Sequence, residues 1–170
     1  MWRAAALAAI VCLGAAAPSS SKVDQLAGRY SRHFPNALMD GTRYWSDDVV
    51  EIVPVGARHA YMRIRLEYAN GHQCGLSGVA VAEGPALVYR EPPEESDDGS
   101  CRLRIQRDGA SLRLDDGGGS CSTYCGARGT LSGVTLPWRS KRPISYLPRL
   151  KASREYVDAL AAWRKTKDEK

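Results

Sequence analysis

The fold is decided by the stretch Cys101-Arg-Leu-Arg-Ile-Gln-Arg-Asp-Gly-Ala-Ser-Leu-Arg-Leu-Asp-Asp116, which continues through a glycine run into Cys121-Ser-Thr-Tyr-Cys125-Gly126. Apolar and polar residues alternate over 101–107 and 111–116, on either side of a turn at Asp108-Gly109-Ala110. Alternation with a period of two is typical of strands that bury one face, and Asp-Gly is a common turn dipeptide. The stretch therefore predicts a β-hairpin whose far end is held by cysteines.

Similar strand patterns precede and follow this hairpin. The clearest covers 60–68, where Met62, Ile64 and Leu66 fall on one face and charged residues on the other. It leads into Asn70-Gly71, a strong hairpin signal. The expected strands are 26–34, 49–54, 60–68, 72–82, 86–90, 101–107, 111–116 and 127–134, with a long loop over 35–45.

The fold class predicted by this order is all-β, an eight-stranded antiparallel up-and-down barrel with a C-terminal α-helix packed outside. Closing about eight strands into a barrel removes both sheet edges. An open sandwich is the competing architecture. The helix is expected over 154–167, capped by Ser153. Tyr156, Leu160 and Trp163 form a stripe along it that should pack on the barrel.

The first 17 residues have the make-up of a secretory signal peptide. A short basic start is followed by an apolar run of about 14 residues, whereas a membrane span needs about 20. We expect a periplasmic or secreted protein, with the barrel domain at 18–136 and a linker and basic helix at 137–170. A lipoprotein acylated at Cys12 is disfavoured because the bulky Val11 precedes that cysteine.

Cys74, Cys101, Cys121 and Cys125 remain after removal of the signal peptide. An even number of cysteines in an exported chain predicts disulfides, here with three possible connectivities. Cys101 and Cys121 flank one hairpin, which favours pairing them and leaves Cys74 with Cys125. A zinc site at Cys121-x3-Cys125 is the alternative, but it lacks a second close pair of ligands.

In an up-and-down meander all these cysteines gather at one end, together with several aromatic side chains. The candidate ligand-binding residues are Phe34, Trp45, His72 and Tyr124, because rings beside a few polar groups in a rigid rim are typical of a binding mouth. The alternative is that Trp45 and Tyr124 only plug the barrel end. Glycine and alanine at 75, 78, 80, 82, 127 and 129 thin two strands, which favours either a hollow interior or a tight strand bend.

Catalysis finds little support in the residues. His33, His59 and His72 are scattered along the chain, and no serine lies in a Gly-x-Ser-x-Gly turn. Asp47 and Asp48 are adjacent on a strand, so they point to opposite faces and are poorly placed for a shared acid/base or metal site. We therefore expect no enzyme activity, no catalytic residues, no cofactor and no metal.

Charge is concentrated in the tail. The formal net charge is +5, and residues 139–170 carry 10 basic and 4 acidic side chains. A basic helix favours peripheral contact with an anionic surface or, more simply, a solvated face. Nucleic acid is disfavoured for an exported chain without a basic, aromatic-interleaved sheet. The expected partner is a small ligand or a protein of the cell envelope, bound by a monomer.

Gly28-Arg29-Tyr30 at the start of the first strand, followed by the barrel strands and a C-terminal helix, resembles the lipocalin-like (calycin) barrels over most of 24–165. That family usually has Gly-x-Trp at this point, with a basic residue from the last strand over the ring. Here the aromatic residue is Tyr30, and Arg139 is the basic residue near the required position. The resemblance implies a barrel that binds a ligand.

The run Cys121-x-x-Tyr-Cys-Gly-Ala-Arg-Gly129 resembles small exported bacterial barrel proteins of uncharacterised function, some of them similar to periplasmic lysozyme inhibitors. Those inhibitors insert a Ser-Gly-x-x-Tyr loop into the enzyme, where this chain has 125–129 instead. The expected function is non-enzymatic binding of a small apolar or cell-wall-derived ligand at the barrel mouth. The alternatives are a protein inhibitor of lysozyme or a related hydrolase, acting through rigid loops at 92–100 and 117–125, and a cell-envelope scaffold.

Overall fold

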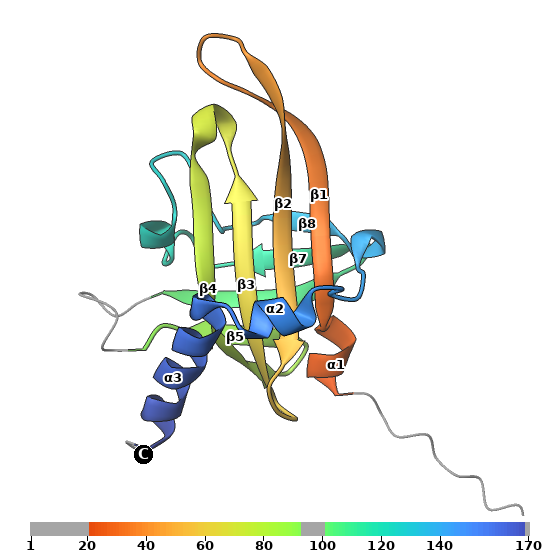
Figure 1. The fold of residues 1–170 in the computed structure, drawn as a ribbon, viewed down its shortest axis with the longest axis vertical. Coiled ribbons are helices and arrows are strands. Elements are labelled where there is room, and N and C mark those ends of the chain that lie inside the picture. The colour runs from red at the N-terminus through yellow and green to blue at the C-terminus, as the bar shows by residue number, and fades with distance from the viewer. Residues whose placement is uncertain (1–20, 93–100, 169–170) are drawn as a thin grey trace, which may run out of the picture.

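A computed structural model describes residues 21–92 and 101–168 of the chain (Figure 1). It contains an eight-stranded sheet in which sequential strands are antiparallel neighbours, in the order β1 to β8. The predicted fold class is confirmed. The strands are β1 (Gly28–Ala37), β2 (Arg43–Pro54), β3 (His59–Glu67), β4 (Gln73–Glu83), β5 (Ala86–Arg90), β6 (Arg102–Asp108), β7 (Ser111–Asp115) and β8 (Thr135–Pro137).

Short helices and one longer helix surround this barrel. The predicted signal peptide and residues 93–100 of the predicted loop lie outside the described residues. Within 21–92 and 101–168, no helix combines the length and apolar character needed to cross a membrane. The helices are α1 (Lys22–Leu26), η1 (Ala69–Gly71), η3 (Ser122–Tyr124), η4 (Trp138–Ser140), α2 (Leu147–Lys151) and α3 (Arg154–Asp168).

Apolar side chains fill the interior of the barrel. Each strand contributes alternate residues to it, as the period-two pattern predicts. The largest fully buried side chains include Tyr30, Met62, Leu103 and Ile105, and they belong to one continuous core cluster. Residues on the other face of β2 and β3, including Val53 and Tyr61, form a second cluster beneath α2 and α3.

The predicted long loop over 35–45 is instead the continuation of a hairpin. β1 and β2 stay paired as far as Ala37 and Arg43, and in Figure 1 this hairpin rises well above the other strands. Pro35 is tolerated because β1 lies at the edge of the sheet there. The side-chain amide of Asn36 donates to Ser46 Oγ and to the carbonyl of Tyr68, both at 3.0 Å, which holds the extension against η1.

The last strand also differs from the prediction. Residues 127–134 contain no strand, and the strand that pairs with β7 is β8. Leu131 is nevertheless buried, and the Leu114 amide donates to the carbonyl of Val134 at 2.8 Å. The segment therefore supplies core contacts without forming a ladder.

The barrel is closed on one side by the chain that follows β8. Arg29 and Arg142 form an isolated bridge, with backbone hydrogen bonds of 2.8 and 2.9 Å in both directions. Trp138 packs on the buried Tyr30, with ring centroids 5.4 Å apart, and the cations of Arg107 and Lys141 lie over the Trp138 ring. The basic groups over this ring therefore come from 107 and 141, whereas the resemblance to lipocalin-like barrels pointed to Arg139.

Helix α3 packs on the outside of β3 and β4, as predicted (Figure 1). Ser153 Oγ accepts a hydrogen bond from the Tyr156 amide at 3.3 Å, which caps the helix. Tyr156 meets Tyr61 edge to face with ring centroids 4.7 Å apart, and Trp163 meets His59 at 4.9 Å. The aromatic stripe is thus used for packing at both ends of the helix.

Candidate binding groove

Strands β4 and β5 part soon after the turn that joins them. Their pairing covers only residues 81–83 of β4 and 86–88 of β5. The next bridge on this side of β4 joins Cys74 to Cys125, beyond the end of β5. Between these two points, residues 75–80 of β4 have no strand partner on this side within the described part of the chain.

Backbone hydrogen bonds show which groups of β4 face this opening. The Ala82 amide donates to the carbonyl of Arg58 at 2.7 Å, on the β3 side. The Gln73 carbonyl accepts from the Gly126 amide at 2.8 Å, on the opposite side. Because the direction alternates along a strand, the N–H and C=O groups of residues 75, 77 and 79 face the opening.

Tyr89 fills the opening from inside the barrel. Its side chain is only 3% exposed, and its ring lies against the backbone of Gly78, where an added Cβ would collide with the ring. The small residues of β4 therefore make room for an aromatic side chain. This answers the question left open by the sequence, because the interior at this point is filled.

Helix α3 forms the outer wall of a groove along this opening, which we call the lateral groove. Its volume is about 790 Å³, and its lining comes from residues 75 and 77–79 of β4, 89–92 at the end of β5, Tyr124, and residues 155, 158, 159, 162, 163 and 166 of α3. Ala159 and Ala162 leave space between the helix and the strand, and Trp163 provides an aromatic end wall. The groove thus combines apolar surface with free backbone groups.

A polar wall faces α3 across the groove. The Tyr124 hydroxyl donates to Glu91 Oε1, and the Cys101 amide donates to Glu91 Oε2 at 3.3 Å. Burial raises the pKa of Tyr124 far above its usual range, and the hydrogen bond to Glu91 raises it further. Tyr124 therefore remains a protonated hydrogen-bond donor, and Glu91 is held as an acceptor at the groove.

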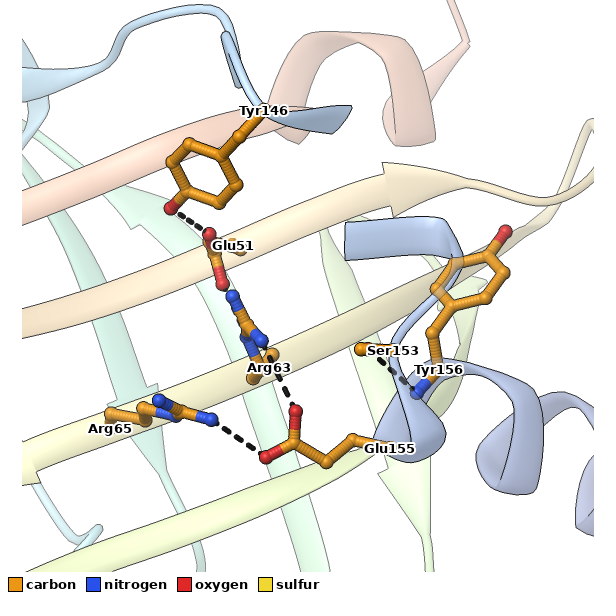
Figure 2. A network of polar contacts seen from close by, with 7 residues as sticks. All are labelled: Glu51, Arg63, Arg65, Tyr146, Ser153, Glu155 and Tyr156. Atoms are coloured by element: carbon orange, nitrogen blue, oxygen red, sulfur yellow. Dashed lines mark hydrogen bonds and ion pairs between the residues drawn. The ribbon is translucent and has the colours of Figure 1, made fainter. Parts of the chain in front are cut away.

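Ion pairs fix the position of α3 beside this opening (Figure 2). Glu51 is 1% exposed and accepts hydrogen bonds from Tyr146 and from Arg63 Nε, the latter at 2.5 Å. Arg63 also reaches Glu155 of α3 at 3.1 Å, and Arg65 reaches the same carboxylate at 2.6 Å. Burial alone would raise the pKa of Glu155, but hydrogen bonds from both arginines outweigh it and lower the pKa. The network ties the helix to the sheet.

Two disulfides hold the strand end of the groove. They join Cys74 to Cys125 and Cys101 to Cys121, the pairing that the sequence favours. Tyr124 lies between Cys121 and Cys125 in the chain. The two disulfides therefore tie the backbone on one side of Tyr124 to β4 and on the other side to the start of β6. Two disulfides suggest an oxidising, extracytoplasmic compartment.

The structure places the four predicted site residues on different surfaces. Tyr124 lines the lateral groove. Trp45 is 66% exposed and stacks on His33, with ring centroids 4.6 Å apart. Phe34 is half-buried beneath the guanidinium of Arg32 at 5.1 Å, and His72 lies beside Gly126.

Asp47 and Asp48 point to opposite faces of β2, as their adjacency predicts. Asp48 is 1% exposed and accepts from Arg32 at 2.5 Å and from the Glu67 amide at 2.9 Å. Asp47 is exposed and lies 3.0 Å from His33. Among the described residues, no group of three or more His, Cys, Asp or Glu side chains is arranged to hold a metal ion.

The sequence reasoning missed most of the groove. The α3 stripe was noticed as a packing feature, and the β4 glycines as a sign of a hollow interior or a tight strand bend. The parting of β4 and β5 has no local signal, because both segments have ordinary strand patterns. Glu91 lies just after β5, between the predicted strand 86–90 and the predicted loop 92–100, and was not considered as a site residue.

Comparison of the chain with protein-family models, with curated proteins and with solved structures finds no match. The fold and the lateral groove therefore carry the functional argument.

Proposed function

We propose that the protein is a non-enzymatic binding protein, periplasmic or secreted after removal of its signal peptide, whose ligand occupies the lateral groove. The observation that carries the proposal is the groove itself, about 790 Å³ in volume between an open strand edge and α3. Ligand sites in proteins are typically concave, about 300–1,000 Å³ in volume, and mostly apolar with a few placed polar groups.

The lining of the groove fits this description. Val79, Ala162 and Trp163 offer apolar surface, while Tyr124 and Glu91 supply a fixed donor and acceptor. The disulfides and the Glu51–Arg63–Glu155 network hold the walls in place before a ligand arrives. Such preorganisation reduces the cost of ordering the site on binding.

The proposal moves the ligand from the barrel mouth to the side of the barrel. Tyr30, Met62, Leu103 and other side chains fill the interior, so a small apolar or cell-wall-derived ligand would have to bind outside. The groove offers the ring surfaces and polar groups that such a ligand needs.

The test uses 1-aminoanthracene as an apolar fluorescent probe and soluble cell-wall fragments as competitors. We expect the probe to bind the purified mature protein, and Ala162→Phe, which fills the groove, to abolish binding. The control variant Trp45→Ala, on the distant hairpin, should leave binding unchanged. Binding that survives Ala162→Phe but is lost in Trp45→Ala would place the site on the β1–β2 hairpin and overturn the proposal.

Inhibition of lysozyme or a related hydrolase is the second candidate function. It is supported by the exposure of residues 126–128 directly after the Cys74–Cys125 disulfide, which presents them on a rigid base. Preorganised, disulfide-held loops are suited to docking in an enzyme cleft. Arg128→Ala should then weaken the inhibition of C-type lysozyme by purified protein, whereas Ala162→Phe should not. Unaltered lysozyme turnover at a large excess of protein would reject this candidate.

A further inference from the structure

We propose that the natural ligand of the lateral groove is an extended peptide segment that adds to β4 as an extra strand and carries basic side chains. This inference rests on the proposed function, since it names the class of ligand for the same groove.

The free edge of β4 is the first argument. The backbone groups of Gly75, Ser77 and Val79 face the groove, and no strand in 21–92 or 101–168 pairs with them. An unpaired edge is a template for pairing with another chain, and proteins that keep such edges free of partners usually cover, charge or shorten them. Here the edge is recessed beside a helix, so a single extended chain is admitted more readily than a second sheet.

The walls of the groove match the geometry of an added strand. Side chains of a strand alternate between two faces. On the outer face they would meet Ala159, Ala162 and Trp163 of α3, and on the inner face Tyr89 and Tyr124. Main-chain hydrogen bonds would supply affinity and the alternate pockets would supply specificity, as in other cases of strand addition.

The charges of the groove select the kind of peptide. Glu155 is neutralised by Arg63 and Arg65, and Arg90 is neutralised by Glu83 in a two-bond contact of 2.6 and 2.9 Å. These side chains leave the groove without net charge of their own. Two further carboxylates in the lining remain to be considered.

Glu91 and Asp158 are these two carboxylates. Glu91 forms no ion pair with any cation of the described residues. Asp158 is paired with Arg154 at 3.4 Å, and the ammonium of Lys167 lies 4.1 Å from the centroid of the Trp163 ring at the end wall. Glu91 is therefore the lining carboxylate without a cationic partner among the described residues, which favours a lysine or arginine of the peptide beside it.

The experiment measures binding by calorimetry with an acetylated and amidated peptide of alternating valine and lysine, about six residues long so that it spans the free edge. Two versions carry N-methyl groups on alternate residues, one on each set, which removes the donors of one edge at a time. A valine–glutamate peptide tests the charge. Ala162→Phe protein tests the place.

We expect the valine–lysine peptide to bind, at least one N-methylated version to bind about tenfold more weakly or worse, and the glutamate version to be rejected. Ala162→Phe should abolish binding. Equal binding of the parent and both N-methylated peptides would overturn strand addition, and equal binding of the glutamate peptide would overturn the basic preference. If 1-aminoanthracene binds in the groove but no peptide does, this inference is wrong while the proposed function stands; if neither binds, both fail.

Discussion

The barrel has two places where neighbouring strands are not fully paired, one between β8 and β1 and the other between β4 and β5, and we call them seams. The two seams are closed in different ways. At the first, backbone hydrogen bonds between Arg29 and Arg142 join β1 to the chain that follows β8, and Trp138 packs over Tyr30. At the second, only residues 81–83 of β4 pair with β5. The gap beside the earlier residues of β4 is filled from inside by Tyr89 and bordered outside by α3.

The difference lies in how the backbone groups at the two seams are satisfied. At the β8–β1 seam, the backbone groups of Arg29 and the amide of Ser31 find partners in the chain after β8, and the partly buried Trp138 packs against the core. The β4–β5 seam satisfies its packing but leaves strand hydrogen-bonding groups facing a groove. A groove is therefore formed at the second seam without hollowing the core, which small domains need for stability.

The largest expected effect comes from removing the disulfide at the end of the open seam. Cys74→Ser with Cys125→Ser should lower the free energy of unfolding by about 4 kcal/mol, because the bond closes a loop with a sequence separation of 51. Urea unfolding under oxidising conditions measures this loss. The matched pair Cys101→Ser with Cys121→Ser, with a separation of 20, should cost about 3 kcal/mol. The reverse order would mean that local packing, not loop closure, decides the contribution.

Trp138→Ala should weaken the β8–β1 seam and leave the β4–β5 seam unchanged. Losing this ring from its place on Tyr30 should reduce the free energy of unfolding by about 3 kcal/mol. Binding of 1-aminoanthracene in the lateral groove should be unchanged below the unfolding transition. A change in probe affinity of the fully folded variant would show that the two seams are coupled and would contradict their independence.

Glu51→Gln should loosen the helix that borders the open seam. The substitution removes the negative charge from a buried site and leaves Arg63 with one partner fewer, which should cost about 2 kcal/mol. Amide hydrogen exchange should speed up in α3 more than in β6 and β7. Asp158→Asn, an exposed control on the same helix, should change stability by less than about 0.5 kcal/mol.

Acidification should weaken the docking of α3 in two steps. Burial lowers the pKa of His59, with the cations of Lys167 and Arg58 acting in the same direction, so the folded state resists its protonation. Stability from His59 is therefore lost as the pH falls below its ordinary value of 6.5 and through the folded value. Glu155, whose pKa is lowered, contributes above 4.5 and loses that contribution at lower pH.

Unfolding measured from pH 8 to pH 4 should show this decline, and the His59→Gln variant should lack the upper step. A stability that rises on acidification across the upper range would contradict the assignment to His59. This effect is the smallest of the set because both side chains are partly exposed.

The sequence predicted most of the barrel, its disulfides and its C-terminal helix, but little of the β4–β5 seam. Alternation at Met62, Ile64 and Leu66 identified a strand, and the position of Cys101 and Cys121 around a hairpin identified a disulfide. Both signals are local. The capped helix after Ser153 was predicted for the same reason.

The failures arise where distant contacts decide the outcome. The β1–β2 extension depends on Asn36 reaching Tyr68 from far away in sequence, and the segment 127–134 is held by the buried Leu131 and by hydrogen bonds from Leu114 and Tyr68 to its carbonyls. Of the candidate residues, Phe34 was predicted on a strand and Trp45 in a loop, and the structure places both on the β1–β2 hairpin, where strand register sends their side chains to opposite faces. Register and strand parting are tertiary properties.

The contact between the Tyr89 ring and Gly78 makes the packing of the β4–β5 seam depend on the residue type at position 78. An added methyl group at residue 78 would collide with the ring, so either the tyrosine or the strand would have to move. Both residues line the groove, so a larger residue here would change its floor. The depth of the lateral groove at this point therefore depends on Gly78, which has no side chain.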